Sequence, residues 1–255
     1  MIDPRLRDRV AVITGCDTAL GISAAIARAL ARQQVRPLLI TEPGADDHLT
    51  PALRADGHTA EALAVDLTDP HAPRQVYDTA EARLGPVEIL VLNTAPSGLD
   101  TFTRARGAEE LTATGIDAHH ERGTRAPALL IAEHHRRHRA RRGEWGRIIT
   151  LSTDVSDGAP GQVSRAAAAH ALESLSRSAA QEFGPTGITV NIIACGAVRT
   201  GWLHRDDAAR LAETSPLGRL GHPDDIADIA AFLASHQARW LTGQTLYAGG
   251  GRRMR

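Results

Sequence analysis

The stretch "RVAVITGCDTALGIS", Arg9–Ser23, sets the expected fold of this 255-residue chain. Its apolar run ends in Gly15, as buried strands often do, and a helical pattern begins at Ile22 after a loop that contains Gly21. In such a strand–loop–helix turn, glycines let the backbone approach a pyrophosphate, and the helix N-terminus supplies N–H donors and a positive dipole. The stretch therefore indicates an α/β fold that can hold a dinucleotide.

The rest of the chain continues this alternation of apolar strands and periodic helices. The expected strands cover residues 9–15, 36–41, 61–70, 87–93, 147–152, 187–194 and 243–251. The expected helices cover residues 22–34, 72–85, 163–183 and 222–235, and a further helical stretch ends within residues 132–146. This pattern predicts a doubly wound, Rossmann-like domain over residues 1–255, with a seven-stranded parallel sheet in the order 3-2-1-4-5-6-7 and helices on both faces.

Composition narrows the function classes. The net charge of −1 gives no electrostatic footprint for nucleic acid or a membrane surface. No segment approaches the roughly 20 apolar residues that span a bilayer, and the start has no apolar run typical of a signal peptide. The two cysteines, Cys16 and Cys195, lie far apart in the sequence and suit a reducing compartment. We expect a cytoplasmic protein that acts on a small molecule and binds neither nucleic acid nor membrane.

Lysine is absent from the sequence, because all 29 residues counted as Lys or Arg are arginines. No residue of this chain can therefore act as a lysine base, a Schiff-base former or a lysine clamp for phosphate. The two tyrosines, Tyr77 and Tyr247, fall in the expected 72–85 helix and in the last expected strand.

Nearly the whole length resembles the short-chain dehydrogenase/reductase superfamily. The segments that carry the resemblance are "VAVITG", "VDLTD", "EILVLNTA", "GRIITLS", "ALESLSRSAAQEFGPTGITVN", "GAVRT", "SPLGRLGHPDDIADIAAFLAS" and "LTGQTLYAGG". Five residues separate Gly15 from Gly21, a spacing that resembles the divergent branch containing the enoyl-acyl-carrier-protein reductases. The resemblance implies that Gly15, Gly21 and Ile22 lie along a pyrophosphate, Asp66 beside an adenine and Asn93 near the adenosine ribose.

The expected second strand ends at Glu42, about 20 residues after Gly21, where an acid hydrogen-bonds a ribose 2′-OH and repels a 2′-phosphate. We therefore expect NAD(H) to be preferred over NADP(H). The alternative is that Gly15 and Gly21 only form a tight turn and that the chain has no cofactor. Asp17 in the loop counts against a bound phosphate, because both are anions.

The resemblance also implies a catalytic tyrosine, a lysine four residues later, and an asparagine on the preceding helix. The segments "GQVSR" and "ALESLSRS" put Arg165 at the tyrosine position and Ala169 at the lysine position. Gly123 falls at the asparagine position. The divergent branch, with its wider gap, would place Gln162 at the tyrosine position instead. Neither version of the usual catalytic set is expected in this chain.

The family's catalytic serine corresponds to Ser152 or Thr153. Arg165 is a poor general acid but a good fixed cation for a developing anion, so we expect these three residues to be catalytic. The alternative for Arg165 is a solvated or ion-paired side chain. Residues 199–216 resemble the family's substrate lid, which makes Trp202 and His204 expected substrate contacts.

The run "HHRRHRARR" belongs to the end of the expected helical stretch that finishes within residues 132–146, where cations are favourable. His134 and His138 share the spacing of a metal site, but no third ligand is evident. We therefore expect a solvated helix end and no metal.

Three functions fit these residues. The first, which the sequence favours, is a redox-neutral enzyme of small-molecule metabolism that stabilises an anion during elimination, cyclisation or ring opening. The second is an NAD(P)H-dependent reductase of an activated alkene or imine with a non-standard proton source. The third is an inactive subunit that pairs with an active homologue. The resemblance further implies a homodimer or homotetramer, with a hetero-oligomer as the alternative.

Overall fold

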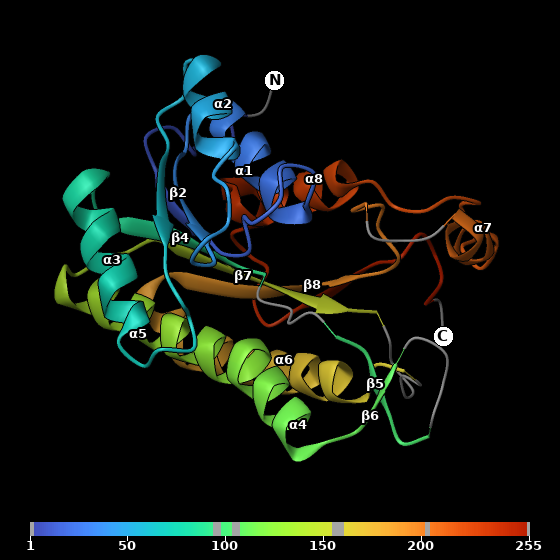
Figure 1. Ribbon diagram of the computed structural model, residues 1–255. Helices are drawn as coiled ribbons and strands as arrows, with labels where there is room; N and C mark the ends of the chain where they lie inside the picture. Colours follow the sequence, from blue (N-terminus) through green and yellow to red (C-terminus); the bar gives the residue numbers. More distant parts are fainter. Residues whose placement is uncertain (1–2, 94–97, 104–107, 155–160, 202–204, 254–255) are drawn as a thin grey trace.

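The computed structural model describes residues 3–93, 98–103, 108–154, 161–201 and 205–253 (Figure 1). A seven-stranded parallel sheet runs through the centre in the order β3-β2-β1-β4-β7-β8-β9, which confirms the expected topology. The strands are β1 (Val10–Ile13), β2 (Arg36–Thr41), β3 (Glu61–Ala64), β4 (Val87–Leu92), β7 (Gly146–Thr153), β8 (Ile188–Cys195) and β9 (Thr245–Ala248). A short parallel pair that the sequence did not reveal, β5 (Asp100–Thr101) with β6 (Glu109–Glu110), lies apart from this sheet.

Helices cover both faces of the sheet (Figure 1). They are α1 (Ile22–Arg32), α2 (Leu49–Ala55), α3 (Ala72–Arg83), α4 (Ala113–His120), α5 (Ala126–Ala140), α6 (Val163–Phe183), α7 (Arg205–Glu213) and α8 (Pro223–Ala234). Helices α1 and α8 pack on one face, and α3, α5 and α6 pack on the other. No helix in the described ranges is both long and apolar enough to span a bilayer.

The alternation of side chains along the strands separates two cores. On β1, Ala11 and Ile13 belong to the core beneath α1 and α8, whereas Val10 and Val12 belong to the core beneath α3, α5 and α6. Successive strand residues point to opposite faces, and a strand buried on both faces is apolar throughout. The run "VAVI" therefore both forms a central strand and feeds both cores.

One π-helical turn, Glu121–Arg125, interrupts the single helical stretch that the sequence indicated and separates α4 from α5. Such turns insert one extra residue into an α-helix and are frequent at functional sites. The turn is fixed to α6 by the Thr124 hydroxyl, which donates to the carbonyl of Ala168 at 3.3 Å.

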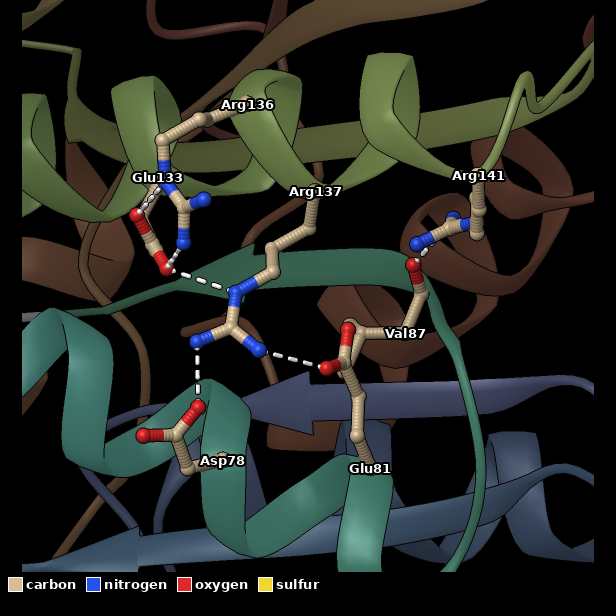
Figure 2. Close-up of polar contacts among 7 residues, drawn as sticks. All are labelled: Asp78, Glu81, Val87, Glu133, Arg136, Arg137 and Arg141. Atoms are coloured by element: carbon tan, nitrogen blue, oxygen red, sulfur yellow. Dashed lines mark hydrogen bonds and ion pairs between the residues drawn. The ribbon is translucent and has the colours of Figure 1, made fainter.

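Arginines anchor the end of α5 to its neighbours, as Figure 2 shows. Arg137 donates to Glu133 on its own helix at 2.7 Å and to Glu81 on α3 at 2.5 Å, and it also pairs with Asp78. Arg141 donates to the carbonyl of Val87 at 2.6 Å. The Arg137 side chain is only 15% exposed, so the expectation of a wholly solvated helix end is wrong for this residue.

The same expectation is wrong for His134 and His138, both of which are fully buried at 0% exposure. His134 Nδ1 is hydrogen-bonded to the hydroxyl of Tyr77 at 2.9 Å, and His138 Nε2 donates to the carbonyl of Thr186 at 2.9 Å. Burial lowers the pKa of His134 to about 3, so its ring is neutral at physiological pH. His134 is therefore a neutral core residue of the α3–α5 face, and His138 is a buried hydrogen-bond donor on the same helix.

Candidate functional site

A cavity of about 660 Å³ opens at the carboxyl ends of the central strands. Ligands of doubly wound folds bind at this edge of the sheet. The lining contains candidate residues from the whole sequence analysis, namely Gly15, Gly21, Ile22, Glu42, Asn93, Ser152, Thr153 and Arg165. The fold thus brings the expected cofactor residues and the expected catalytic residues to one continuous cavity.

The glycine loop forms one wall. Gly15 has a φ of +72°, and a Cβ there would lie 2.2 Å from the carbonyl oxygen of Asn93, so only glycine fits. Gly21 is the N-cap of α1, and no side chain in the described ranges caps that helix. The loop and the uncapped N–H groups of α1 therefore fit the pyrophosphate of a dinucleotide.

Hydrogen bonds hold this loop against β4. Asn93 Nδ2 donates to the hydroxyl of Ser23 at 2.9 Å, and that hydroxyl donates to the carbonyl of Thr14 at 2.7 Å. The Asn93 backbone N–H donates to the Thr14 hydroxyl at 2.9 Å. Asn93 thus lines the cavity and also fixes the position of the wall.

Glu42, directly after β2, has partners on both sides. Its backbone N–H donates to Asp17 Oδ1 at 2.7 Å, and its carboxylate pairs with Arg122 at 2.8 Å. Asp17 thus has a structural use, because one of its carboxylate oxygens binds the end of β2. Sequence reasoning missed Arg122, although it precedes Gly123, which was singled out as the position of the family's asparagine.

Asp66 lies in the exposed turn after β3. Its Oδ1 accepts from the backbone N–H of Thr68 at 2.9 Å and from the Thr68 hydroxyl at 2.8 Å. These hydrogen bonds hold the pKa of the Asp66 carboxyl below its usual value. The cavity wall itself includes Val65, Leu67 and Thr68 rather than the Asp66 side chain.

The two candidate hydroxyls at the end of β7 differ in their surroundings. Ser152 donates to Glu173 Oε1 at 2.6 Å, and Glu173 is a buried residue of α6. Thr153 makes no side-chain hydrogen bond to any residue that the structure describes, and it lines the cavity. Thr153 therefore has the hydroxyl that is available to a ligand.

Arg165 projects from the first turns of α6 into the cavity lining, together with Gln162 and Ala169. Burial lowers the pKa of its guanidinium from the usual value, without removing its positive charge at neutral pH. No acidic group within the described ranges forms an ion pair with it. The expected substrate contacts Trp202 and His204 lie outside the described residues, and the 199–216 lid remains a prediction.

Asp154 is a cavity residue that the sequence did not signal. It is only 7% exposed, and its Oδ2 has no hydrogen-bond partner in the described part of the chain. Burial raises the pKa of its carboxyl, and Arg252 and Arg253 oppose that rise. A plain Asp after a Ser-Thr pair carries no motif, so only the fold reveals its burial.

Burial also raises the pKa of both cysteine thiols, which makes them poor nucleophiles. Burial raises the pKa of Cys195 to about 12, with Asp154 adding to the rise and Arg165 opposing it. Burial likewise raises the pKa of Cys16, whose thiol donates to the carbonyl of Ile13 at 3.5 Å. Both thiols therefore stay protonated at neutral pH.

Comparison with known proteins defines the family. A family described as "Enoyl-(Acyl carrier protein) reductase" matches residues 15–253. The chain belongs to the short-chain dehydrogenase/reductase family. It is 33% identical over 250 residues to an uncharacterized oxidoreductase, YjdA, of Bacillus subtilis, covering 96% of this chain and 97% of that protein. It is 34% identical to the cis-4-hydroxycyclohexanecarboxylate dehydrogenase of Sinomonas cyclohexanicum, covering 96% of each chain.

Two further proteins are similar to this chain over nearly its whole length. The 3-oxoacyl-[acyl-carrier-protein] reductase FabG of Escherichia coli is 32% identical, covering 95% of this chain and 96% of its own. A solved dehydrogenase/reductase from Sinorhizobium meliloti superposes with a TM-score of 0.88 at 29% identity, over 98% of this chain and 97% of its own. The chain is therefore an oxidoreductase-like member of a family that generally binds NAD(P)(H) and acts on small molecules.

Proposed function

We propose that this chain is an NAD(H)-dependent reductase of a small molecule with an activated C=C or C=N bond. The observation that carries the proposal is a continuous cavity, in which the glycine wall and Glu42 join the segment of α6 that holds Arg165. The names of the relatives favour hydride transfer over the redox-neutral chemistry that the sequence favoured.

Residues of this chain would share the binding of the dinucleotide. The loop from Gly15 to Gly21 and the start of α1 at Ile22 would hold the pyrophosphate, and Glu42 would face the adenosine ribose. When bound, the nicotinamide supplies the hydride. A 2′-phosphate would meet the carboxylate of Glu42, so we propose that NADH is preferred over NADPH.

Arg165 would stabilise the negative charge that forms on the substrate as the hydride arrives. A fixed cation in a partly dehydrated cavity acts strongly on such charge and needs no reorganisation during the reaction. The Thr153 hydroxyl would hydrogen-bond the polar atom of the group that is conjugated with the reacting double bond. The proton that completes the reduction would come from water or from an acid other than the tyrosine that the family uses.

The test combines binding and turnover. Calorimetry should show NADH binding, and NADH oxidation should follow addition of conjugated enones or imines but not of simple ketones. Simple alcohols should not reduce NAD+. Restoring the family pair through Arg165→Tyr with Ala169→Lys should tighten dinucleotide binding if the α6 register is as inferred. Robust reduction of simple ketones by the wild-type protein would refute the argument from the missing tyrosine and lysine.

A second candidate is the redox-neutral enzyme, and one observation favours it. Arg165 is a cation in the cavity wall with no acidic partner in the described ranges, and anion stabilisation needs no hydride. Failure of either dinucleotide to bind at millimolar concentration would move the function to this candidate or to an inactive subunit.

We further propose that the chain forms a homodimer or homotetramer. Trp240 is 95% exposed and Phe232 is 44% exposed, so apolar side chains are available for contact between copies. Light scattering of the purified protein would measure the assembly, and a monomer that gains mass only with a co-expressed homologue would indicate a hetero-oligomer.

A further inference from the structure

Glu42 and Arg122 reach each other from separate elements around the cavity. Glu42 follows β2, and Arg122 belongs to the π-helical turn between α4 and α5. Arg122 Nη1 lies 2.8 Å from Glu42 Oε1, and both residues line the cavity. Each side chain is 41% exposed, so the pair remains accessible to a bound molecule.

The turn that holds Arg122 is itself fixed. Arg125 Nη2 donates to the carbonyl of Thr68 at 2.9 Å, which attaches the turn to the segment after β3. The Thr124 hydroxyl attaches the turn to α6. On the other side, Glu42 is fixed by the Asp17 carboxylate, which accepts from its backbone N–H. Neither partner of the ion pair is therefore placed by a loose surface loop.

The ion pair changes how strongly the acid after β2 can discriminate against a 2′-phosphate. A lone carboxylate repels a 2′-phosphate and is free to accept hydrogen bonds from ribose hydroxyls. A guanidinium at 2.8 Å offsets that negative charge and occupies one of its oxygens. Its remaining N–H donors suit phosphate oxygens, since arginine binds phosphate through a planar fork.

We propose that Arg122 is a specificity-determining residue that reduces the preference for NADH over NADPH imposed by Glu42. The proposal rests on the proposed function, because it requires that a dinucleotide binds in this cavity. It assigns opposite roles to the two partners: Glu42 excludes the 2′-phosphate, and Arg122 tolerates it. The ratio of the two dissociation constants therefore reports on the pair.

The experiment measures dissociation constants for NADH and NADPH by calorimetry, in the wild-type protein and in Arg122→Ala, Glu42→Gln and the double variant. Arg122→Ala should weaken NADPH binding about 3–10-fold, the range expected for one partly exposed charge-assisted contact, and should leave NADH binding equal or tighter. Glu42→Gln should shift the ratio toward NADPH, because Arg122 then has no acidic partner at that position. The double variant should lose the part of that shift that comes from Arg122 and keep the part that comes from removal of the repelling carboxylate.

Controls separate this role from general charge effects. Arg83→Ala removes an arginine that is paired with Glu61 away from the cavity, and it should leave the ratio unchanged. Arg122→Lys keeps the charge and should retain much of the NADPH binding, which also covers the case in which Arg122→Ala does not fold. Competition by 2′,5′-ADP against 5′-AMP should follow the same order as the two dinucleotides.

The outcomes are distinct. If dinucleotides bind and Arg122→Ala, or Arg122→Gln where the alanine variant does not fold, leaves the NADH-to-NADPH ratio unchanged, the role of Arg122 is wrong and the proposed function stands. If neither dinucleotide nor the adenosine fragments bind to the wild-type protein or to any variant, the proposed function and the role of Arg122 fall together.

Discussion

Ser152 donates a hydrogen bond to the buried carboxylate of Glu173 at 2.6 Å, whereas the neighbouring Thr153 lines the cavity without such a partner among the described residues. The family's serine position fell on one of these two residues, and the structure separates them. Ser152 satisfies a buried acid, which also lies 3.4 Å from Arg177. Thr153 retains a hydroxyl for a ligand.

The first prediction compares these hydroxyls. Ser152→Ala removes a donor from the buried Glu173 carboxylate and should lower the free energy of unfolding by about 1–3 kcal/mol. Thr153→Val should change stability less and reduce turnover more, because its hydroxyl would contact substrate. Urea denaturation and steady-state kinetics of both variants test this, and a larger kinetic loss in Ser152→Ala would reverse the assignment.

The second prediction concerns Arg165. Arg165→Ala should reduce turnover by roughly 10²–10³, as loss of a preorganised electrostatic contact does, while the melting temperature stays nearly unchanged. Arg165→Lys, which keeps a cation at the same position, should recover part of the rate. Unchanged kinetics in Arg165→Ala would remove its catalytic role and favour the inactive-subunit interpretation.

The third prediction follows from the burial of His134. Its pKa falls from 6.5 to about 3 on folding, so below pH 6.5 the unfolded chain binds a proton that the folded chain does not. The stabilising contribution is present above pH 6.5 and declines as pH falls toward 3, by up to roughly 1.4 kcal/mol per pH unit. Chemical denaturation between pH 7 and 4 measures this loss. His134→Gln should flatten that pH dependence, and an equally steep decline in the variant would contradict the assignment.

The fourth prediction concerns Asp154, whose folded pKa is raised by burial. Its folded form holds a proton more tightly than the unfolded form, so its contribution is favourable at low pH and is lost as pH rises through the folded pKa. Asp154→Asn should therefore raise the melting temperature at pH 8 and have little effect near pH 4. A variant that is destabilised equally at both values would indicate a hydrogen-bonding role instead.

Periodicity was sufficient to predict the layers and the strand order. The apolar runs and the helix at Val163–Phe183 are long and regular, and parallel crossovers leave few alternatives for their arrangement. Gly15 could be chosen from the sequence because a tight turn between a strand and a helix requires a backbone conformation that glycine adopts most easily. Such signals are local, because all the residues that produce them lie in one short segment of the sequence.

Long-range partners could not be predicted in this way. The hydrogen bond of Ser152 to Glu173 and the ion pair of Glu42 with Arg122 each join residues from different elements. The burial of Asp154 likewise depends on residues that are distant in the sequence. The histidines of α5 were misjudged for a related reason. A run of histidine and arginine resembles a solvated helix end until the packing of α3 against α5 is known.

The π-helical turn at Glu121–Arg125 has a consequence for how this cavity can change. The turn holds one residue more than an α-helical turn, and each residue corresponds to about 100° of rotation about a helix axis. Deleting one residue there would restore a continuous helix and rotate α4 and the start of the turn relative to α5, separating Arg122 from Glu42. The charge that Arg122 presents to this cavity is therefore open to change by the loss or gain of a single codon, a route that surveys of substitutions alone would miss.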